Sequence, residues 1–130
     1  MNVVDSSAWL EYFANGPNAS YFAPPIEKTA DLIVPSLTLY EVFKLILVQR
    51  DEGAALQAVA AMQQGQVVDL DASLALTAAR VSVERKLPMA DSIILTTAAI
   101  HGAELWTQDA DFKGLPRVRY RKHKAKGRVG

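Results

Sequence analysis

The sequence predicts an α/β fold in which one parallel β-sheet is covered by helices on both faces. Short apolar runs alternate along the chain with segments whose apolar side chains repeat at helical spacing. The runs lack the strict polar–apolar alternation of a sheet with one solvated face, so we expect strands that are buried on both faces. The chain of 130 residues shows no internal repeat and no interdomain linker, which argues for a single domain.

The predicted strands are short apolar runs that end at turn or charged residues. The first run stops at Asp5, and the second is closed by Pro35. In chain order the predicted strands cover residues 3–4, 32–34, 67–70, 103–106 and 118–120.

The predicted helices are bounded by capping residues and by glycines or prolines. Good N-caps, or a proline in the first turn, mark helix starts at Ser6 or Ser7, Ser36, Asp71 and Pro88. The prolines at positions 24 and 25 make the start of the second helix ambiguous. In chain order the predicted helices cover residues 6–14, 19–30, 36–50, 53–64, 72–86 and 88–101.

Charged residues are distributed unevenly along the chain, although the net charge is zero. All fourteen acids lie at or before Asp111 together with six basic residues, so this part carries a net charge of −8. From Lys113 onward there are eight basic residues and no acid, a net charge of +8. We divide the chain into a domain at 1–121 and a basic tail at 122–130. Such a tail is typical of a polyanion-binding segment, and equally of a solvated, disordered C-terminus.

Four acidic residues occupy positions where acids are not needed for solubility. Asp5 follows the first predicted strand and Asp109 follows the fourth, at the edge where parallel α/β sheets bind their ligands. Asp91 has apolar neighbours on its helix face, and Glu41 interrupts an apolar helical run. The four carboxylates are therefore candidates for one site in a crevice at this edge.

Each carboxylate also has an ordinary structural explanation. Asp5 and Asp91 are suitable N-caps for the helices that follow them. Asp109 can form an Asx-turn with the next residues, and Glu41 can pair with Lys44 on the surface of its helix. Four coincidences would be needed if all of these explanations held.

A cluster of carboxylates needs a cation to stay ionised. Three or four carboxylates within ~5 Å of one another repel strongly and raise each other's pKa unless a cation holds them charged. Because the chain has no cysteine and no histidines at ligand spacing, we expect a hard ion, Mg²⁺ or Mn²⁺, rather than Zn²⁺. Such an ion activates water and stabilises the charge that develops on a phosphodiester, and the sequence leaves open whether one or two ions bind.

Other chemistries lack their residue patterns. The absence of cysteine excludes disulfide scaffolds, thiolate metal sites and cysteine nucleophiles. The chain has no P-loop, no dinucleotide-binding glycine motif and no serine nucleophile elbow. We interpret His101 as a helix-terminal residue and His123 as part of the tail. No signal peptide and no apolar run of ~20 residues is visible, so we expect a soluble, cytoplasmic protein without membrane association.

Four spaced motifs carry a resemblance to a known family. They are Val-Val-Asp-Ser-Ser at 3–7, Leu-Tyr-Glu-Val at 39–42, Leu-Pro-Met-Ala-Asp-Ser-Ile-Ile at 87–94 and Leu-Trp-Thr-Gln-Asp-Ala-Asp-Phe at 105–112. In this order they resemble the motifs of the PIN-domain family and, within it, of the VapC-type toxins of toxin–antitoxin pairs. The third and fourth motifs together are specific, whereas the first is weak alone.

The resemblance implies a nuclease site that cuts RNA and leaves a 5′-phosphate and a 3′-hydroxyl. The residues that it implies as holders of the metal are Asp5, Glu41, Asp91 and Asp109. The hydroxyl groups that would support these ligands belong to Ser7 and Thr107, and Asp111 would be a peripheral acid.

The resemblance also implies partners. Many members form homodimers and are silenced by an antitoxin, a segment of which fills a hydrophobic groove. The aromatic residues that would line such a groove, or else form ordinary core, are Trp9, Tyr12, Phe13, Tyr40 and Phe43. The tail departs from the family pattern, and the residues that we expect to contact RNA phosphates are Arg119, Arg121, Lys122, Lys124 and Lys126.

The main hypothesis is therefore a metal-dependent endoribonuclease, the toxin of a toxin–antitoxin pair, in which metal-activated water attacks the scissile phosphate. One rival is a housekeeping PIN nuclease of RNA maturation, against which the short single-domain chain argues mildly. The other is a PIN module that binds RNA or protein without cutting. The complete set of carboxylates argues against this module, which would not need four like charges together.

Overall fold

The computed structural model describes residues 1–125 and contains one parallel sheet in the order β3-β2-β1-β4-β5. The strands are β1 (Asn2–Val4), β2 (Leu32–Pro35), β3 (Gln66–Val68), β4 (Glu104–Thr107) and β5 (Val118–Tyr120). The helices are α1 (Ser6–Phe13), α2 (Ala19–Glu27), α3 (Ser36–Gln49), α4 (Glu52–Met62), α5 (Ala72–Arg85) and α6 (Met89–Ile100). Two short 3₁₀ turns, η1 (Thr29–Asp31) and η2 (Ala110–Phe112), complete the described chain. The predicted fold class is confirmed.

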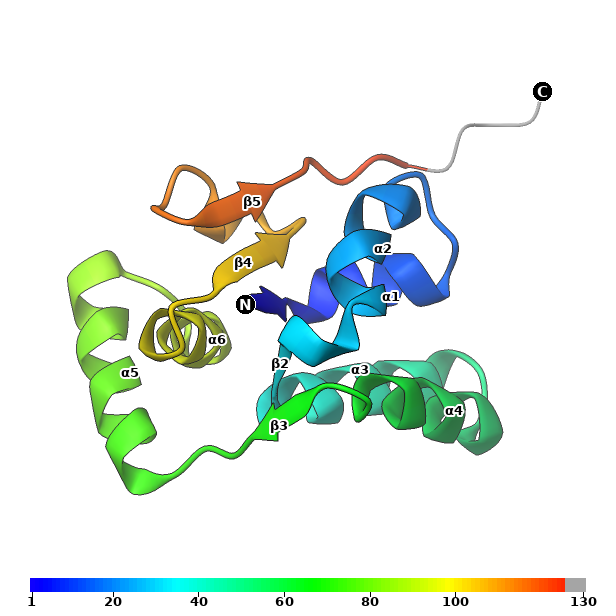
Figure 1. Ribbon diagram of the computed structural model, residues 1–130, viewed down its shortest axis with the longest axis horizontal. Helices are drawn as coiled ribbons and strands as arrows, with labels where there is room; N and C mark the ends of the chain where they lie inside the picture. The colour runs from blue at the N-terminus through cyan, green and yellow to red at the C-terminus, as the bar shows by residue number, and fades with distance from the viewer. Residues whose placement is uncertain (126–130) are drawn as a thin grey trace.

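Helices cover both faces of the sheet, with α1 to α4 on one side and α5 and α6 on the other (Figure 1). Successive residues of a strand point to opposite faces. Val4 therefore packs in the core under α1 to α4, whereas Val3 packs in the core under α6. The alternation repeats in β2, where Leu32 and Val34 share the first core and Ile33 belongs to the second. As predicted, the central strands are buried on both faces.

The strand order opens a crevice at the carboxyl ends of β1 and β4. From β1 the chain moves outward to β2 and β3, and it then returns through α5 and α6 to β4 on the other side of β1. Connections that leave adjacent strands on opposite faces create a gap at the strand ends, and ligands of open α/β sheets bind in such gaps. Asp5 and Asp109 follow these two strands, so both lie at the edge that the sequence predicted.

Some helix starts differ from the prediction. Ser6 is the first residue of α1 and Asp5 holds the N-cap position, so neither Ser6 nor Ser7 is the cap. Ser36 is likewise the first residue of α3 rather than its cap. Asp71 does cap α5, where its Oδ1 accepts a hydrogen bond from a backbone amide at 2.8 Å. The hydroxyls of Ser6 and Ser7 are consequently available to bind side chains.

The prolines at positions 24 and 25 lie inside α2, and the helix ends at Glu27, before the predicted end at residue 30. Because proline has no backbone amide, Pro24 and Pro25 leave carbonyls in the preceding turn of α2 without a helical donor. Within residues 1–125, no helix is long and apolar enough to cross a membrane.

Candidate active site

Asp5 is a buried carboxylate held by two hydroxyl groups. It is 4% exposed and lies between β1 and α1. Its Oδ2 accepts hydrogen bonds from the Ser7 hydroxyl at 2.7 Å and from the Thr107 hydroxyl at 2.9 Å. Since Ser7 is in the first turn of α1 and Thr107 ends β4, this carboxylate joins the carboxyl ends of two neighbouring strands. The two hydroxyl groups that were expected to support the site therefore both contact Asp5.

Asp91, Asp109 and Asp111 form a group of carboxylates, which we call the aspartate cluster. Each offers an oxygen within 4.8 Å of the other two. Asp91 is in the first turn of α6, and Asp109 immediately precedes η2, where its Oδ1 accepts a hydrogen bond from the Asp111 amide at 2.9 Å. Asp111 was expected to be peripheral, but its carboxylate lies within the cluster, on the exposed side.

Thr107 connects Asp5 to this cluster. The Thr107 hydroxyl donates to Asp5 and accepts a hydrogen bond from the Asp109 amide at 2.9 Å. One buried side chain at the end of β4 thus orients carboxylates from two segments that are about a hundred residues apart in the sequence.

The carboxylates disfavour one another's ionisation. Burial is the main cause that raises the pKa of Asp91 to about 7, and the charge of Asp109, a hydrogen bond with Asp111 and the charge of Asp5 add to it. Burial also raises the pKa of Asp5, although the hydrogen bonds from Ser7 and Thr107 work in the opposite direction. A cation among these oxygens would lower the pKa of the carboxyl groups, because it stabilises their ionised forms.

The aspartate cluster fits a hard divalent cation. All of its ligand atoms are carboxylate oxygens, and within residues 1–125 the group includes no histidine. Mg²⁺ and Mn²⁺ prefer such oxygen ligands, whereas Zn²⁺ sites in proteins are rich in nitrogen and sulfur. The raised pKa of Asp91 supports the same view, because three mutually repelling carboxylates at one place need a positive charge to stay ionised.

Glu41 lies on α3 and is not a member of the aspartate cluster. Its Oε1 accepts a hydrogen bond from the Ser6 hydroxyl at 2.7 Å, and Ser6 directly follows Asp5. Glu41 and Lys44 form neither of the two salt bridges in residues 1–125, and the Lys44 ammonium lies over the Tyr40 ring instead. The structure therefore places Glu41 next to the Asp5 side of the crevice, through Ser6.

Of the N-cap and Asx-turn roles that could explain the three aspartates, only the Asx-turn of Asp109 is formed by a side-chain hydrogen bond in the structure. Asp109 forms the expected Asx-turn with Asp111. Asp5 holds an N-cap position, but its carboxylate makes no capping hydrogen bond and binds Ser7 and Thr107 instead. Asp91 is not a cap, because α6 begins at Met89.

The aromatic residues that were expected to line a groove divide between core and surface. Trp9 is 1% exposed and belongs to the core, so it cannot line an open groove. Tyr12, Phe13 and Phe43 are half-buried against the same core, whereas Tyr40 is 61% exposed.

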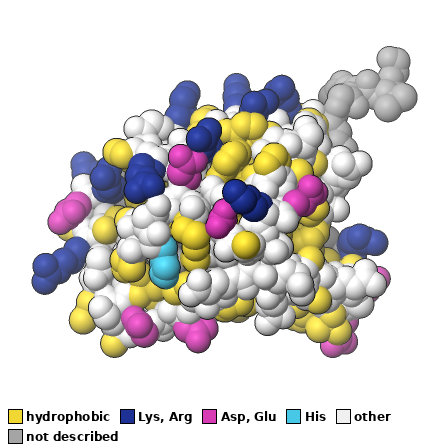
Figure 2. Space-filling model, in the orientation of Figure 1, with side chains coloured by type: hydrophobic (Ala, Val, Ile, Leu, Met, Phe, Trp, Pro, Cys, Tyr) yellow, Lys and Arg dark blue, Asp and Glu magenta, His cyan; other side chains and the backbone are white. Residues whose placement is uncertain are grey.

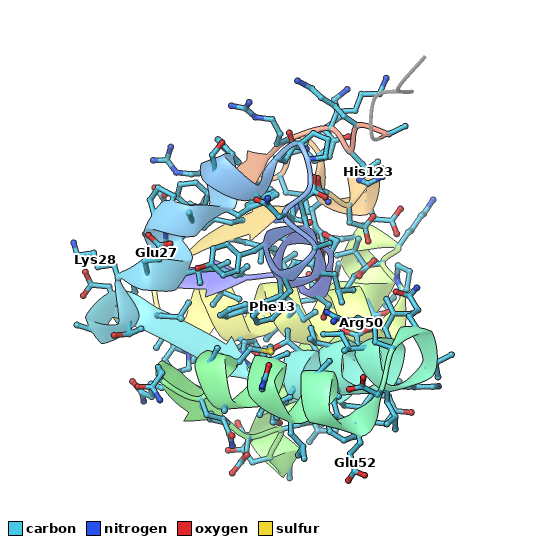
Figure 3. All side chains as sticks on the ribbon, turned by 90° about the vertical axis from the view of Figure 1, so that its right-hand side faces the viewer. Phe13, Glu27, Lys28, Arg50, Glu52 and His123 are labelled. Carbon is cyan, nitrogen blue, oxygen red and sulfur yellow. The ribbon has the colours of Figure 1, made fainter. Side chains whose placement is uncertain are left out.

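Two pockets lie along this face of the molecule. The first, of about 310 Å³, lies between α1 and the α3–α4 hairpin, and Phe13 and Arg50 line it from opposite sides (Figure 3). The second, of about 500 Å³, follows α3 and is lined by Tyr40 and Glu41 among others. Leu10 of α1 lines both pockets, and the second lies along α3 beside Glu41.

The basic residues that were expected to contact RNA lie in β5 and in the segment after it. Figure 2 shows Lys and Arg side chains along this edge of the molecule. Arg119 forms a salt bridge with Glu104, and the Arg121 guanidinium lies 4.1 Å from the centre of the Tyr21 ring. Lys122 and Lys124 are exposed, and Lys126 lies outside the described residues.

Sequence reasoning missed three buried polar residues beside the site, namely Glu11, Asn18 and Gln108. The side-chain Nδ2 of Asn18 donates to Gln108 Oε1 at 2.7 Å, and the backbone amide of Asn18 donates to Glu11 Oε2 at 2.9 Å. In the sequence, Asn18 reads as part of the turn after α1 and Gln108 as part of the loop after β4. Only Glu11 carried a signal, since it is an acid between apolar residues of a short helix.

The family model of the PIN domain matches residues 3–118. No curated protein matches this chain by sequence. Among solved structures, a toxin–antitoxin complex from Klebsiella pneumoniae has a chain that is 23% identical, with a TM-score of 0.77, and the match covers 92% of this chain and 96% of that one.

Two further structures are similar in fold. VapC20 of Mycobacterium tuberculosis, a toxin that cleaves the sarcin–ricin loop, is 19% identical with a TM-score of 0.74, and 89% of this chain and 95% of that one are covered. A DNA-bound VapBC complex from Salmonella typhimurium has a chain that is 20% identical with a TM-score of 0.70, and 94% and 98% are covered. At these identities the likenesses show the fold alone.

Proposed function

Because the chain belongs to the PIN-domain family, we propose that it is a metal-dependent endoribonuclease and the toxin of a toxin–antitoxin pair. The single observation that carries the proposal is the aspartate cluster with Asp5 behind it, at the switch point of a parallel sheet. A non-catalytic module would gain nothing from carboxylates that raise one another's pKa. The toxin role draws support from the neighbours in fold, which include toxins crystallised with their antitoxins.

The metal-holding residues in this proposal are Asp5, Asp91, Asp109 and Asp111, with Glu41 at the Asp5 side of the crevice. When bound, Mg²⁺ or Mn²⁺ would lower the pKa of a water molecule and stabilise the charge that develops on the scissile phosphate. We include Asp111 because its carboxylate oxygen lies within 4.8 Å of those of Asp91 and Asp109. Glu41 contacts the site through the Ser6 hydroxyl, next to Asp5.

The protein's own contribution is to hold the carboxylates rigidly before substrate arrives. Ser7 and Thr107 fix one oxygen of Asp5, and the Thr107 hydroxyl also fixes the backbone of Asp109. The Asx-turn then sets the direction of the Asp109 side chain relative to Asp111. Such preorganisation lowers the reorganisation that the reaction requires, and it places the water, phosphate and carboxylates in one crevice.

We propose that RNA reaches this crevice along the basic edge and the tail at 122–130. Arg121, Lys122 and Lys124 are exposed beyond β5, on the segment that follows the carboxyl edge of the sheet. Lysine and arginine side chains in such a place attract phosphates and make binding salt-dependent. Arg119 contributes less in this proposal, because Glu104 already neutralises it.

For the antitoxin we propose the two pockets along α1 and α3. Tyr40 and Val48 are 61% and 76% exposed there, and Leu45 lines the pocket between them. An amphipathic segment that covered these side chains would end beside Glu41 and thus close to the carboxylates. Such an arrangement would explain how one partner both buries an apolar surface and blocks access to the site.

We also propose that the protein forms a homodimer and acts in the cytoplasm. Leu76 and Val83 are exposed on one side of α5, seven residues apart, and Ile100 is exposed at the end of α6. Exposed apolar side chains at this spacing form a stripe that a second copy can cover.

The proposal is tested by an RNA cleavage assay on the purified protein with Mg²⁺, with Mn²⁺ and with chelator, beside Asp91→Asn. We expect cleavage that needs metal and is lost in the variant. Asp31→Asn is a matched control, because Asp31 pairs with Lys28 on the surface in η1. Cleavage that survives in Asp91→Asn would indicate a contaminating nuclease. A wild type that binds several structured RNAs without cutting them would support the non-catalytic module instead.

A further inference from the structure

Asn18 connects the C-terminal segment to the loop that carries Asp109. It is 2% exposed, and its Nδ2 donates to Gln108 Oε1 at 2.7 Å and to the Lys122 carbonyl at 2.9 Å. Gln108 directly precedes Asp109, and its amide donates to the Ser7 hydroxyl, which in turn donates to Asp5. The start of this segment is thus held at two points: the Arg121 backbone amide donates to the Thr107 carbonyl at 3.0 Å, and the buried Asn18 side chain binds the Lys122 carbonyl.

This segment borders an open pocket of about 310 Å³ next to the carboxylates, which we call the side pocket. It is lined by Ser7, Leu10, Glu11, Gln108 and His123. Ser7 and Gln108 line it on the side of the site, and His123 lines it from the C-terminal segment. Two of the residues that line the side pocket therefore connect it to the site: Ser7 binds Asp5, and Gln108 directly precedes Asp109.

The polarity of the side pocket selects the part of a nucleotide that can enter it. Glu11 is 7% exposed, accepts one hydrogen bond from the Asn18 amide and belongs to neither salt bridge of residues 1–125. A buried carboxylate without a cation repels phosphate and accepts N–H or O–H donors. The base or ribose would therefore face Glu11, and the phosphates would lie toward the exposed Lys122 and Lys124.

We infer that the side pocket is a subsite for the base and ribose of the RNA nucleotide next to the scissile phosphate, that residues 121–125 form its outer wall, and that Asn18 positions this wall. The inference rests on the proposed nuclease function and names a substrate contact of the same site. His123 provides a flat ring at the mouth, where a base can stack on it. Asn18 acts only through the wall that it holds.

The experiment compares Asn18→Ala and His123→Ala with the wild type in steady-state RNA cleavage. We expect each variant to raise KM roughly fivefold or more with little change in kcat, because a stacking contact with the base is lost. The KM of the double variant should be no higher than that of Asn18→Ala, because both substitutions act on the same wall of the side pocket. His101→Ala is the matched control, because His101 lies after α6 at the opposite edge of the sheet.

A second measurement separates positioning from general stability. In ¹⁵N relaxation, the backbone order parameters of residues 122–124 should fall in Asn18→Ala and stay unchanged in His123→Ala. Unchanged order parameters in Asn18→Ala would overturn the positioning role, and an unchanged KM in His123→Ala would overturn the subsite. A wild type that cuts RNA beside variants that cut it equally well would refute this inference alone. A wild type that neither binds nor cuts RNA would refute the proposed function and the subsite together.

Discussion

The side chains of Thr107 and Asp5 are joined by a hydrogen bond of 2.9 Å across 102 residues of sequence. The same hydroxyl accepts a hydrogen bond from the Asp109 amide, so it holds both sides of the crevice. Both partners of the bond are buried, and the site therefore depends on a contact that solvent cannot replace.

Thr107→Val should weaken both the fold and the site. Valine keeps the shape but leaves a buried carboxylate and a backbone amide without their partner, which costs about 1–3 kcal/mol. Urea denaturation measures this loss, and metal-dependent cleavage should fall in parallel. Thr107→Ser keeps the hydroxyl and is the control that should retain activity. If Thr107→Val were as stable and as active as the wild type, the hydroxyl would have no organising role.

The stability of the metal-free protein should fall as the pH rises toward neutrality. The pKa of Asp91 is about 7 in the folded protein, above its ordinary value of 3.8, so the folded state holds a proton that the unfolded state has released. The stability that protonated Asp91 contributes to the folded state is complete below about pH 4 and is lost as the pH rises through 7. Thermal unfolding with chelator between pH 4.5 and 8 measures the slope.

In Asp91→Asn this slope should become shallower, because the titrating group is gone. The raised pKa of Asp5 acts in the same direction, so part of the slope should remain. A variant with the wild-type slope would show that Asp91 does not titrate as the structure indicates.

Divalent metal should stabilise the wild type and not the site variants. A ligand that binds only the folded state at a hundred times its Kd stabilises it by about 2.7 kcal/mol. We expect Mg²⁺ or Mn²⁺ to raise the Tm of the wild type, with little effect on Asp91→Asn or Asp109→Asn. Metal binding releases protons from carboxylates whose pKa is raised. The metal-induced shift in Tm should therefore grow with pH up to about 7. Equal shifts in all three proteins would place the metal elsewhere.

Gly16→Ala should destabilise the protein by disturbing Glu11. An added Cβ at Gly16 would lie 1.9 Å from Glu11 Oε1, so the carboxylate would have to leave the Asn18 amide. A buried amide without its acceptor costs about 1–3 kcal/mol. Gly53→Ala is the control, because its Cβ would meet an atom only at 3.4 Å inside α4, and alanine favours a helix. Denaturation should therefore show opposite signs for the two variants.

RNA affinity should fall as the salt concentration rises, and the slope of log K against log salt should depend on the basic residues after β5. Each phosphate contact with single-stranded nucleic acid contributes about −0.7 to the slope of log K against log salt. Replacing Lys122 and Lys124 by alanine should therefore make the slope shallower by roughly 1.4. Binding is measured with Asp91→Asn as the background, so that RNA is not cut. A slope that does not change would remove these lysines from the RNA interface.

The sequence alone was sufficient for the fold class and for the positions of the strands and helices. Apolar runs and their spacing report directly which faces are buried, and Asp5 and Asp109 are placed at one sheet edge by following two strands of a parallel sheet. Helix starts were less certain, because a serine can cap a helix or be its first residue. Ser6 is the first residue of α1, and its hydroxyl binds Glu41 from a distant segment, whereas the Ser7 hydroxyl binds the neighbouring Asp5.

Only the tertiary structure decided which polar side chains meet. Asp111 joins the aspartate cluster because the turn after β4 brings it back beside Asp91, and Trp9 is core because α1 lies on the sheet. Asn18 is the clearest case, since its partners are 90 and 104 residues away. Local sequence reports burial through periodicity, but a hydrogen bond between distant segments leaves no periodic trace, so it emerges only when the chain is folded.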